Sequence, residues 1–286
     1  MADQTLANIP AQQQQWPGRT AELTPVPDHG ETGYQGRERL VGKRALITGG
    51  DSGIGRATAI AFAKEGADVA ISYLAQEQDD AEETKRQVEA AGRTCVLCPT
   101  DQRTEQANID LAEKAADALG GIDVLVSNAA YQMTHDTIED FPGEQVKRTF
   151  ETNVFATFWL AKALAPKLAE GSSIAITTSI QAFSPSENLL DYAATKAALN
   201  NMMVNLASML GPRGIRVNAV APGPIWTPLI PATMPEEKVE GFGSDTPLGR
   251  AGQPIEVASA FVFLASDEAS YVSGTVLGVT GGKPIF

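Results

Sequence analysis

The chain is poor in the residues that build disulfide or metal frameworks. It contains two cysteines and two histidines in 286 residues, and His29 and His135 lie far apart in the sequence. Two cysteines exclude a disulfide scaffold, and two distant histidines do not support a zinc site, so we expect no metal. Cys95 and Cys98 form a C-x-x-C pattern, but they fall in a predicted strand, whose period of two points them to opposite faces.

Long hydrophobic runs and an excess of positive charge are also absent. No apolar run approaches the ~18–20 residues of a membrane helix, and residues 1–15 lack the basic and apolar regions of a secretory signal. The chain has 22 lysines and arginines against 35 aspartates and glutamates, a net charge of −13. This balance argues against nucleic acid and against an anionic membrane surface as partners. We therefore expect a cytoplasmic protein.

The first forty residues differ in composition from the rest of the chain. Residues 1–40 contain four consecutive glutamines, Gln12 to Gln15, with several prolines and glycines and no apolar periodicity. This composition indicates an irregular, extended N-terminal arm that is too polar to form a core of its own. The widely spaced apolar residues Leu6, Ile9, Trp16 and Tyr34 suggest that the arm lies across its own or a neighbouring subunit and supplies no catalytic group.

Residues 41–286 alternate short apolar runs with longer amphipathic stretches. The runs predict strands at 44–48, 68–73, 94–98, 123–127, 173–178, 216–221 and 276–279. The stretches predict helices near 54–65, 77–91, 104–119, 143–169, 190–210 and 254–265. Strands that alternate with helices form a parallel sheet with helices on both faces, so we expect one doubly wound α/β domain. The loop-rich segment 222–253 is a candidate lid.

A glycine-rich loop follows the first predicted strand. In Gly49-Gly50-Asp51-Ser52-Gly53-Ile54-Gly55, glycine permits a sharp turn, a close approach to a pyrophosphate and close helix packing. The helix that follows presents free N–H groups to an anion. An ordinary glycine turn is the alternative, but the position at the head of a βαβ series favours nucleotide binding.

Tyr192 and Lys196 lie four residues apart in a predicted helix and so share one face. A nearby ammonium can lower the pKa of a tyrosine and make it a useful acid and base. Composition predicts roughly 0.2 such pairs by chance, from 5 × 10/286, so the pair alone is not decisive. Ser179, at the end of a strand, is suited to bond a carbonyl oxygen, although strand capping is the commoner role. Asn153 lies inside a predicted helix although asparagine is a poor helix former. Its presence there requires an explanation, such as a bound water or a distortion of the helix.

Together these motifs resemble the classical short-chain dehydrogenase/reductase family over residues 41–286. The subgroup with an N-terminal extension, similar to general stress proteins and glucose/ribitol dehydrogenases, resembles the chain in its polar arm and its Leu190-Asp191-Tyr192 context. The resemblance implies a Rossmann domain, bound NAD(P) and a catalytic tetrad of Asn153, Ser179, Tyr192 and Lys196. The cofactor-binding residues that it implies are Gly49, Asp51, Ser52, Gly53, Ile54, Gly55, Tyr73, Asp101, Gln102, Asn128, Ala129, Lys196, Pro222, Gly223, Ile225 and Thr227.

Two residues depart from the family pattern after the fourth strand, where Ser127 replaces Asn and Ala130 replaces Gly. Neither position touches the reacting atoms. The resemblance implies that hydride passes between nicotinamide and a carbonyl carbon while Tyr192 transfers the proton. Ser179 would orient the oxygen, Lys196 would bond the ribose and lower the pKa of Tyr192, and Asn153 would hold a relay water.

Two other functions remain open at this point. A non-catalytic NAD(P)-binding redox sensor would not need the full tetrad, whereas nothing in the sequence separates a dehydrogenase from a lyase or epimerase on the same fold. The substrate is expected to be an aldehyde, ketone or polyol. Loop positions predict that its pocket is lined by Tyr131, Met133, Gln181, Phe183, Leu189, Trp226 and Leu229.

The sequence also bears on cofactor choice and assembly. Tyr73 stands where NAD-selective sheets carry a carboxylate, and no acid lies between Tyr73 and Glu77, so a neutral pocket should accept NAD and NADP within about tenfold of each other.

The predicted helix 143–169 carries an excess of apolar residues, namely Phe150, Val154, Phe155, Phe158 and Trp159. Family resemblance and this excess favour a homotetramer built on helices 143–169 and 190–210.

Overall fold

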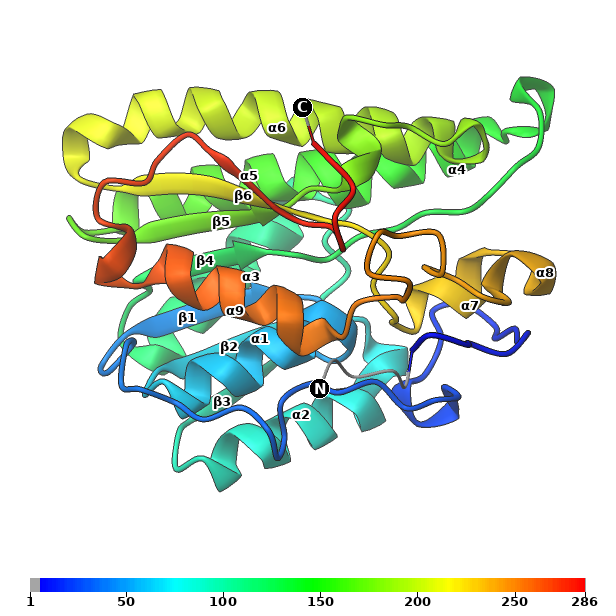
Figure 1. Cartoon of the computed structure of the whole chain (residues 1–286). Helices are drawn as coiled ribbons and strands as arrows, with labels where there is room; N and C mark the ends of the chain where they lie inside the picture. The colour runs from blue at the N-terminus through cyan, green and yellow to red at the C-terminus, as the bar shows by residue number, and fades with distance from the viewer. Residues whose placement is uncertain (1–5, 286) are drawn as a thin grey trace.

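Seven parallel strands form one sheet over residues 6–285, the part of the chain that the computed structural model describes (Figure 1). Their order is β3-β2-β1-β4-β5-β6-β7. The strands are β1 Arg44–Thr48, β2 Asp68–Tyr73, β3 Cys95–Pro99, β4 Val124–Ser127, β5 Ser173–Thr177, β6 Arg216–Pro222 and β7 Val276–Val279. The order reverses between β1 and β4, and ligands of open sheets bind outside the carboxyl ends at such a point. The predicted doubly wound domain is confirmed.

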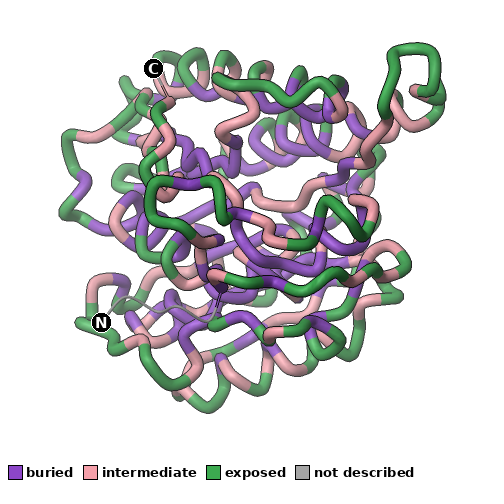
Figure 2. Tube along the Cα trace, turned by 45° about the vertical axis from the view of Figure 1, so that its right-hand side comes forward, coloured by how far each residue is buried: buried purple, intermediate pink, exposed green. Residues whose placement is uncertain are grey.

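Helices cover both faces of the sheet and create two hydrophobic cores. One core packs α1 (Gly53–Lys64), α2 (Gln78–Ala90) and α9 (Pro254–Ala265), and the other packs α3 (Glu105–Leu119), α5 (Ala156–Leu164) and α6 (Leu190–Leu210). Buried chain accordingly runs through the centre of the molecule in Figure 2. Cys95 belongs to the first core and Cys98 to the second, so β3 points the two thiols to opposite faces as predicted.

The prediction of one continuous helix over residues 143–169 is wrong in detail, because the helix is interrupted. It consists of α4 (Gly143–Phe150), a π-helical turn (Glu151–Phe155) and α5. A π turn holds one more residue than an α turn, and such turns often occur at functional sites. This turn leaves Phe155 exposed and buries Val154, which therefore belongs to the core and not to an exposed apolar surface.

The N-terminal arm shares a core with the lid segment. Leu6, Ile9 and Leu23 are buried against Trp226 and Val239, together with residues of α7 (Leu229–Thr233) and α8 (Glu236–Val239). The arm packs across its own subunit, one of the two placements that the sequence leaves open, and three of its aliphatic side chains are almost fully buried there. Folding of the arm and folding of the lid depend on the same apolar contacts.

Residues 6–285 contain neither a membrane-spanning helix nor a candidate metal site. No helix of this range is both long and apolar enough to cross a bilayer. The same range brings together no group of three histidine, cysteine or acidic side chains that could hold a metal ion.

Candidate active site

The glycine-rich loop connects β1 to the first turn of α1. Gly53 has φ +49°, a left-handed value that favours glycine. A Cβ on Gly55 would lie 1.8 Å from the carbonyl oxygen of Gly49, so only glycine allows the helix to approach the loop this closely. Ser52 is extended, and α1 begins directly after it. The free N–H groups and partial positive charge of this helix end therefore face the cavity beside the loop.

A cavity of about 740 Å³ lies at the carboxyl ends of the strands. Most of the predicted cofactor and catalytic residues line it: Gly49, Asp51, Ser52, Gly53, Ile54, Tyr73, Asp101, Gln102, Asn128, Ala129, Ser179, Tyr192, Lys196, Pro222, Gly223, Ile225 and Thr227. Gly55 and Asn153 do not line it. Gly55 is confined to the loop–helix contact, and the amide of Asn153 is turned into the protein. The cavity is large enough for a dinucleotide cofactor with a small substrate.

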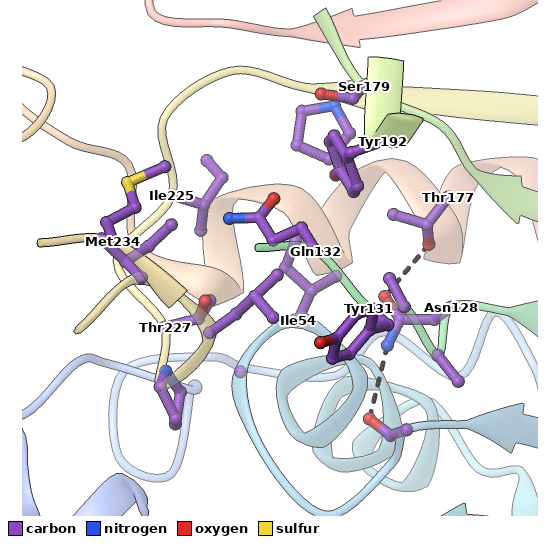
Figure 3. Close-up of a pocket in the computed structure, with 18 of the residues that line it drawn as sticks. Ile54, Asn128, Tyr131, Gln132, Thr177, Ser179, Tyr192, Ile225, Thr227 and Met234 are labelled. Carbon is purple, nitrogen blue, oxygen red and sulfur yellow. Dashed lines mark hydrogen bonds between the residues drawn. The ribbon is translucent and has the colours of Figure 1, made fainter. Parts of the chain in front are cut away.

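A chain of hydrogen bonds fixes the floor of the cavity across three strands. The backbone N–H of Asn128 donates to the Thr48 hydroxyl (2.9 Å), and its side-chain amide donates to the Thr48 carbonyl (3.1 Å). The Thr177 hydroxyl donates to Asn128 Oδ1 (3.0 Å), as Figure 3 shows. Lys196 Nζ then donates to the Thr177 carbonyl (2.8 Å). The fourth-strand motif therefore connects the glycine-rich loop to the lysine.

Tyr192, Ser179 and Lys196 come together at one end of the cavity. Tyr192 and Lys196 project from α6, with Lys196 Nζ 5.3 Å from the centre of the Tyr192 ring. Ser179 follows β5, where its Oγ accepts from the Gln181 N–H (3.1 Å) and caps a short 3₁₀ turn. Figure 3 shows Ser179 and Tyr192 side by side. The same hydroxyl thus caps the turn that follows β5 and lies next to Tyr192.

Burial shifts both titratable groups of this pair toward their neutral forms. It raises the pKa of Tyr192 to about 12, an effect that the hydrogen bond with Ser179 partly offsets. It lowers the pKa of Lys196 to about 7. The expected lowering of the Tyr192 pKa is therefore not found in the protein alone, because burial, which disfavours the phenolate, outweighs the hydrogen bond with Ser179.

Asn153 lies in the π turn and braces three segments. Its Oδ1 accepts from the Tyr131 N–H (2.8 Å), and its Nδ2 donates to the Tyr131 carbonyl (3.0 Å) and to the Thr195 hydroxyl (3.0 Å). The Thr195 hydroxyl donates to the Tyr192 carbonyl (2.6 Å). The asparagine that is unfavourable in a regular helix thus joins the loop after β4 to the helix that carries Tyr192.

The end of β2 carries a carboxylate that the sequence did not place there. A 3₁₀ turn after β2 folds Glu77 back, so that its Oε2 accepts from the Leu74 N–H (2.9 Å), and Glu77 lines the cavity with Asp51 and Tyr73. The premise of a pocket without acids is therefore wrong. Burial raises the pKa of Glu77 to about 8 and that of Asp51 to about 6, and mutual repulsion adds to the first shift.

Two residues after β3 have different environments. Asp101 is exposed and forms an ion pair with Arg103 (2.6 Å), which lowers its pKa. Gln102 is buried, accepting from the Ser72 hydroxyl (3.2 Å) and donating to Asn108 Oδ1 (3.1 Å). Asp101 is thus available at the rim of the cavity, while Gln102 also fixes the loop.

The predicted substrate pocket is only partly correct. Tyr131, Gln181, Leu189 and Leu229 line the cavity, whereas Met133, Phe183 and Trp226 do not. Trp226 is fully buried in the core shared by arm and lid, where its Nε1 donates to the Pro25 carbonyl (2.7 Å). Lining residues that sequence reasoning missed include Gln132 and Met234, both labelled in Figure 3, and Trp16, Pro17 and Arg148. No local motif distinguishes these five, because their contacts join distant segments.

Known proteins are similar to the chain over nearly its whole length. A family model described as Enoyl-(Acyl carrier protein) reductase matches residues 49–283. General stress protein 39 of Bacillus subtilis is 51% identical over 276 residues, covering 96% of each chain. Glucose and ribitol dehydrogenase of Daucus carota is 45% identical over 278 residues, also covering 96% of each. A solved short-chain dehydrogenase from Burkholderia cenocepacia in complex with NADP has 36% identity and a TM-score of 0.80, covering 85% of this chain and 98% of that one.

The chain therefore belongs to the short-chain dehydrogenase/reductase family. It is an NAD(P)-dependent oxidoreductase of that family and takes a small-molecule substrate. Its similarity to general stress protein 39 and to glucose and ribitol dehydrogenase confirms the predicted subgroup. The cavity is consistent with such a cofactor, because Gly49, Ser52 and Gly53 of the glycine-rich loop line it at the start of α1 and because a buried carboxylate oxygen of Asp51, without a hydrogen-bond partner among residues 6–285, lies on its wall.

Proposed function

We propose that the protein is a carbonyl reductase in which Tyr192 is the proton donor. The observation that carries the proposal is the convergence of Tyr192, Ser179 and Lys196 in the cavity that also contains the glycine-rich loop. The substrate class is an aldehyde or ketone, with a polyol as the substrate of the reverse, oxidative direction, and the naming of a relative as glucose and ribitol dehydrogenase supports this class. The wall formed by Gln132, Leu189 and Met234 mixes amide and apolar groups, which suits a small oxygenated molecule.

The residues have complementary roles in this proposal. Nicotinamide, when bound, supplies the hydride. Ser179 donates a hydrogen bond to the substrate oxygen and aligns it with the Tyr192 hydroxyl. Tyr192, which burial keeps protonated across the physiological range, transfers its proton to that oxygen as negative charge develops there.

Lys196 and Asn153 act around this proton transfer. Lys196 is positioned by the Thr177 carbonyl, and we propose that it bonds the nicotinamide ribose and provides positive charge next to Tyr192. The burial-lowered pKa of Lys196, about 7, allows it to return a proton to Tyr192 near neutral pH. We propose that Asn153, whose amide braces the Tyr131 backbone and Thr195, orients the polar groups through which that proton is replaced.

We also propose that both NAD and NADP serve, within about tenfold of each other near neutral pH. Glu77 lies at the end of β2, but its raised pKa of about 8 leaves most of it uncharged at pH 7, so it does not strongly repel a 2′-phosphate. A homotetramer in the cytoplasm is the expected assembly. The exposed apolar residues of α5, α6 and the π turn support it, including Phe155, Phe158, Val204 and Met209.

Tyr192→Phe tests the mechanism. The substitution removes only the hydroxyl, so turnover should fall about 10²–10⁴-fold while the Kd for NADPH stays within about twofold. Carbonyl-dependent NADPH oxidation and fluorescence titration measure the two quantities, with a panel of aldehydes, sugars and ketones as substrates. Lys196→Ala is the companion variant and should weaken both turnover and cofactor binding. Near-normal turnover in Tyr192→Phe would contradict the mechanism.

A further inference from the structure

The first part of the arm is a hairpin closed by glutamine side chains. Gln12 accepts from the Thr24 N–H at Oε1 (3.0 Å) and donates to the Thr24 carbonyl from Nε2 (2.5 Å). Gln14 makes the same pair of bonds to Arg19, at 2.6 and 3.3 Å. We call residues 12–24 the arm hairpin. The glutamine run that resembles a low-complexity segment thus has a specific structure, with Trp16 at its tip.

The arm hairpin is fixed to two elements beside the cavity. The Thr20 N–H donates to Asp80 Oδ2 of α2 (3.1 Å), and the Gln14 N–H donates to the Pro231 carbonyl of the lid (2.9 Å). Next to the tip, Gly18 has φ +88°, and a Cβ there would lie 2.7 Å from the Pro228 carbonyl oxygen. The hairpin is therefore seated tightly on the lid and on the helix that follows β2.

The tip of the hairpin reaches the opposite side of the cavity. The Arg148 guanidinium carbon lies 4.1 Å from the centre of the Trp16 ring and 4.2 Å from the centre of the Tyr131 ring. The two rings also meet edge to face at 5.7 Å. Arg148 belongs to α4, on the side of the sheet packed by α6, whereas Asp80 belongs to α2 on the other side. Within residues 6–285, Arg148 Nε is buried without a hydrogen-bond partner, so stacking is its main contact with the arm.

The path of the hairpin relative to the strands determines what it would cover. A dinucleotide in a sheet of this order extends along the carboxyl ends of the strands, from β2 to β6. The hairpin bonds α2, which follows β2, and the lid, which follows β6, and its tip rests beside the end of β4. Trp16 and Pro17 line the same cavity as Ser52 and Asp101. The hairpin thus crosses the mouth of the cavity between its two ends.

We propose that the arm hairpin is a strap over the bound cofactor and that Trp16 is a cofactor-retaining residue. The inference rests on the proposed cofactor site. The backbone anchors at Thr20 and Gln14 remain in place, while the stack of Trp16 on Arg148 and Tyr131 opens and closes the mouth. A cation–π contact changes an equilibrium about 2- to 30-fold, so the stack is strong enough to slow cofactor release and weak enough to open during turnover. In this proposal the arm contributes a cofactor-retaining residue to the site and, as the sequence predicts, no catalytic group.

Trp16→Ala in the full chain tests the strap. NADPH dissociation, followed by stopped-flow fluorescence with excess NADP as the competitor, should be about tenfold faster than in the wild type. Trp16→Phe keeps a ring on Arg148 and should recover part of the effect. Arg148→Met should also speed release, and the double variant should be no faster than the faster single variant, because both break the same stack. Val26→Ala, at an exposed position of the arm, is the control and should release NADPH at the wild-type rate.

The outcomes separate the strap from the proposed function. If the wild type binds NADPH and folded Trp16→Ala releases it at the wild-type rate, the strap is refuted while the proposed function stands. A raised KM for the carbonyl substrate with unchanged NADPH release would place Trp16 on the substrate and also refute the strap. If the wild type binds neither NADPH nor NADH, both inferences fail. Equal thermal stability of Trp16→Ala and the wild type shows that a change in release is not a folding defect.

Discussion

Replacing Lys196 by methionine should stabilise the cofactor-free protein while it destroys function. Lys196 is 1% exposed, and its ammonium makes a hydrogen bond to the Thr177 carbonyl (2.8 Å). Burial lowers its pKa from 10.5 to about 7. The folded protein thus binds a proton at this site less readily than the unfolded chain does, and below pH 7 folding must desolvate a charge. Methionine has a similar length and carries no charge, so Lys196→Met removes the cost of burying the ammonium.

The magnitude follows from the two pKa values. A shift of 3.5 units, from 10.5 to about 7, corresponds to about 5 kcal/mol at about 1.4 kcal/mol per unit. Loss of the bond to Thr177 offsets about 1 kcal/mol of this. Lys196→Met should therefore be more stable than the wild type by about 3–4 kcal/mol at pH 6. A lowered lysine pKa makes wild-type stability rise between about pH 7 and 10.5, so the advantage should shrink by about 2.5 kcal/mol between pH 6 and pH 9.

Urea unfolding of both proteins at equal concentration, at pH 6 and pH 9, measures this difference. Lys167→Met, at an exposed lysine, is the matched control and should change stability by less than about 0.5 kcal/mol at either pH. Turnover and cofactor affinity of Lys196→Met should both be severely reduced, as expected where a functional site is maintained at a cost in stability. A variant that is less stable than the wild type at pH 6, or a difference that does not change with pH, would refute the reasoning.

Two further predictions concern the cofactor pocket and the arm. Ionisation of Glu77 above about pH 8 should lower the affinity for NADP relative to NAD about fivefold, and Glu77→Gln should abolish this pH dependence. Calorimetric titration of both cofactors at pH 6.5 and pH 9 measures the two dissociation constants. If their ratio in the wild type is the same at both pH values, the prediction is contradicted. Leu6→Ala empties a fully buried position and should lower the free energy of unfolding by about 2–5 kcal/mol in urea, whereas the exposed Val26→Ala should stay within about 0.5 kcal/mol. Equal losses in both variants would argue against the shared core.

The sequence was sufficient to predict the sheet and the groups at its carboxyl ends. Apolar runs located all seven strands, because a strand buried between two helical layers must be apolar on both faces. The positions of Gly55 and of the Tyr192–Lys196 pair follow from local geometry, since glycine is required where a helix approaches a loop and residues four apart share a helical face. These features depend on near neighbours in the chain.

Contacts between distant segments were decided only by the tertiary structure. Glu77 shares the cavity wall with Asp51 of the glycine-rich loop, Asn153 lies in a π turn where its amide bonds the Tyr131 backbone, and burial reverses the expected pKa shift of Tyr192. Trp16 lies in a polar arm. The contact that holds its ring at the cavity is made with Arg148, more than a hundred residues away in the sequence. The sequence by itself thus determined the fold and the chemistry available at the site. Desolvation and long-range packing, which no local pattern encodes, determined the charge states and the residues that close the cavity.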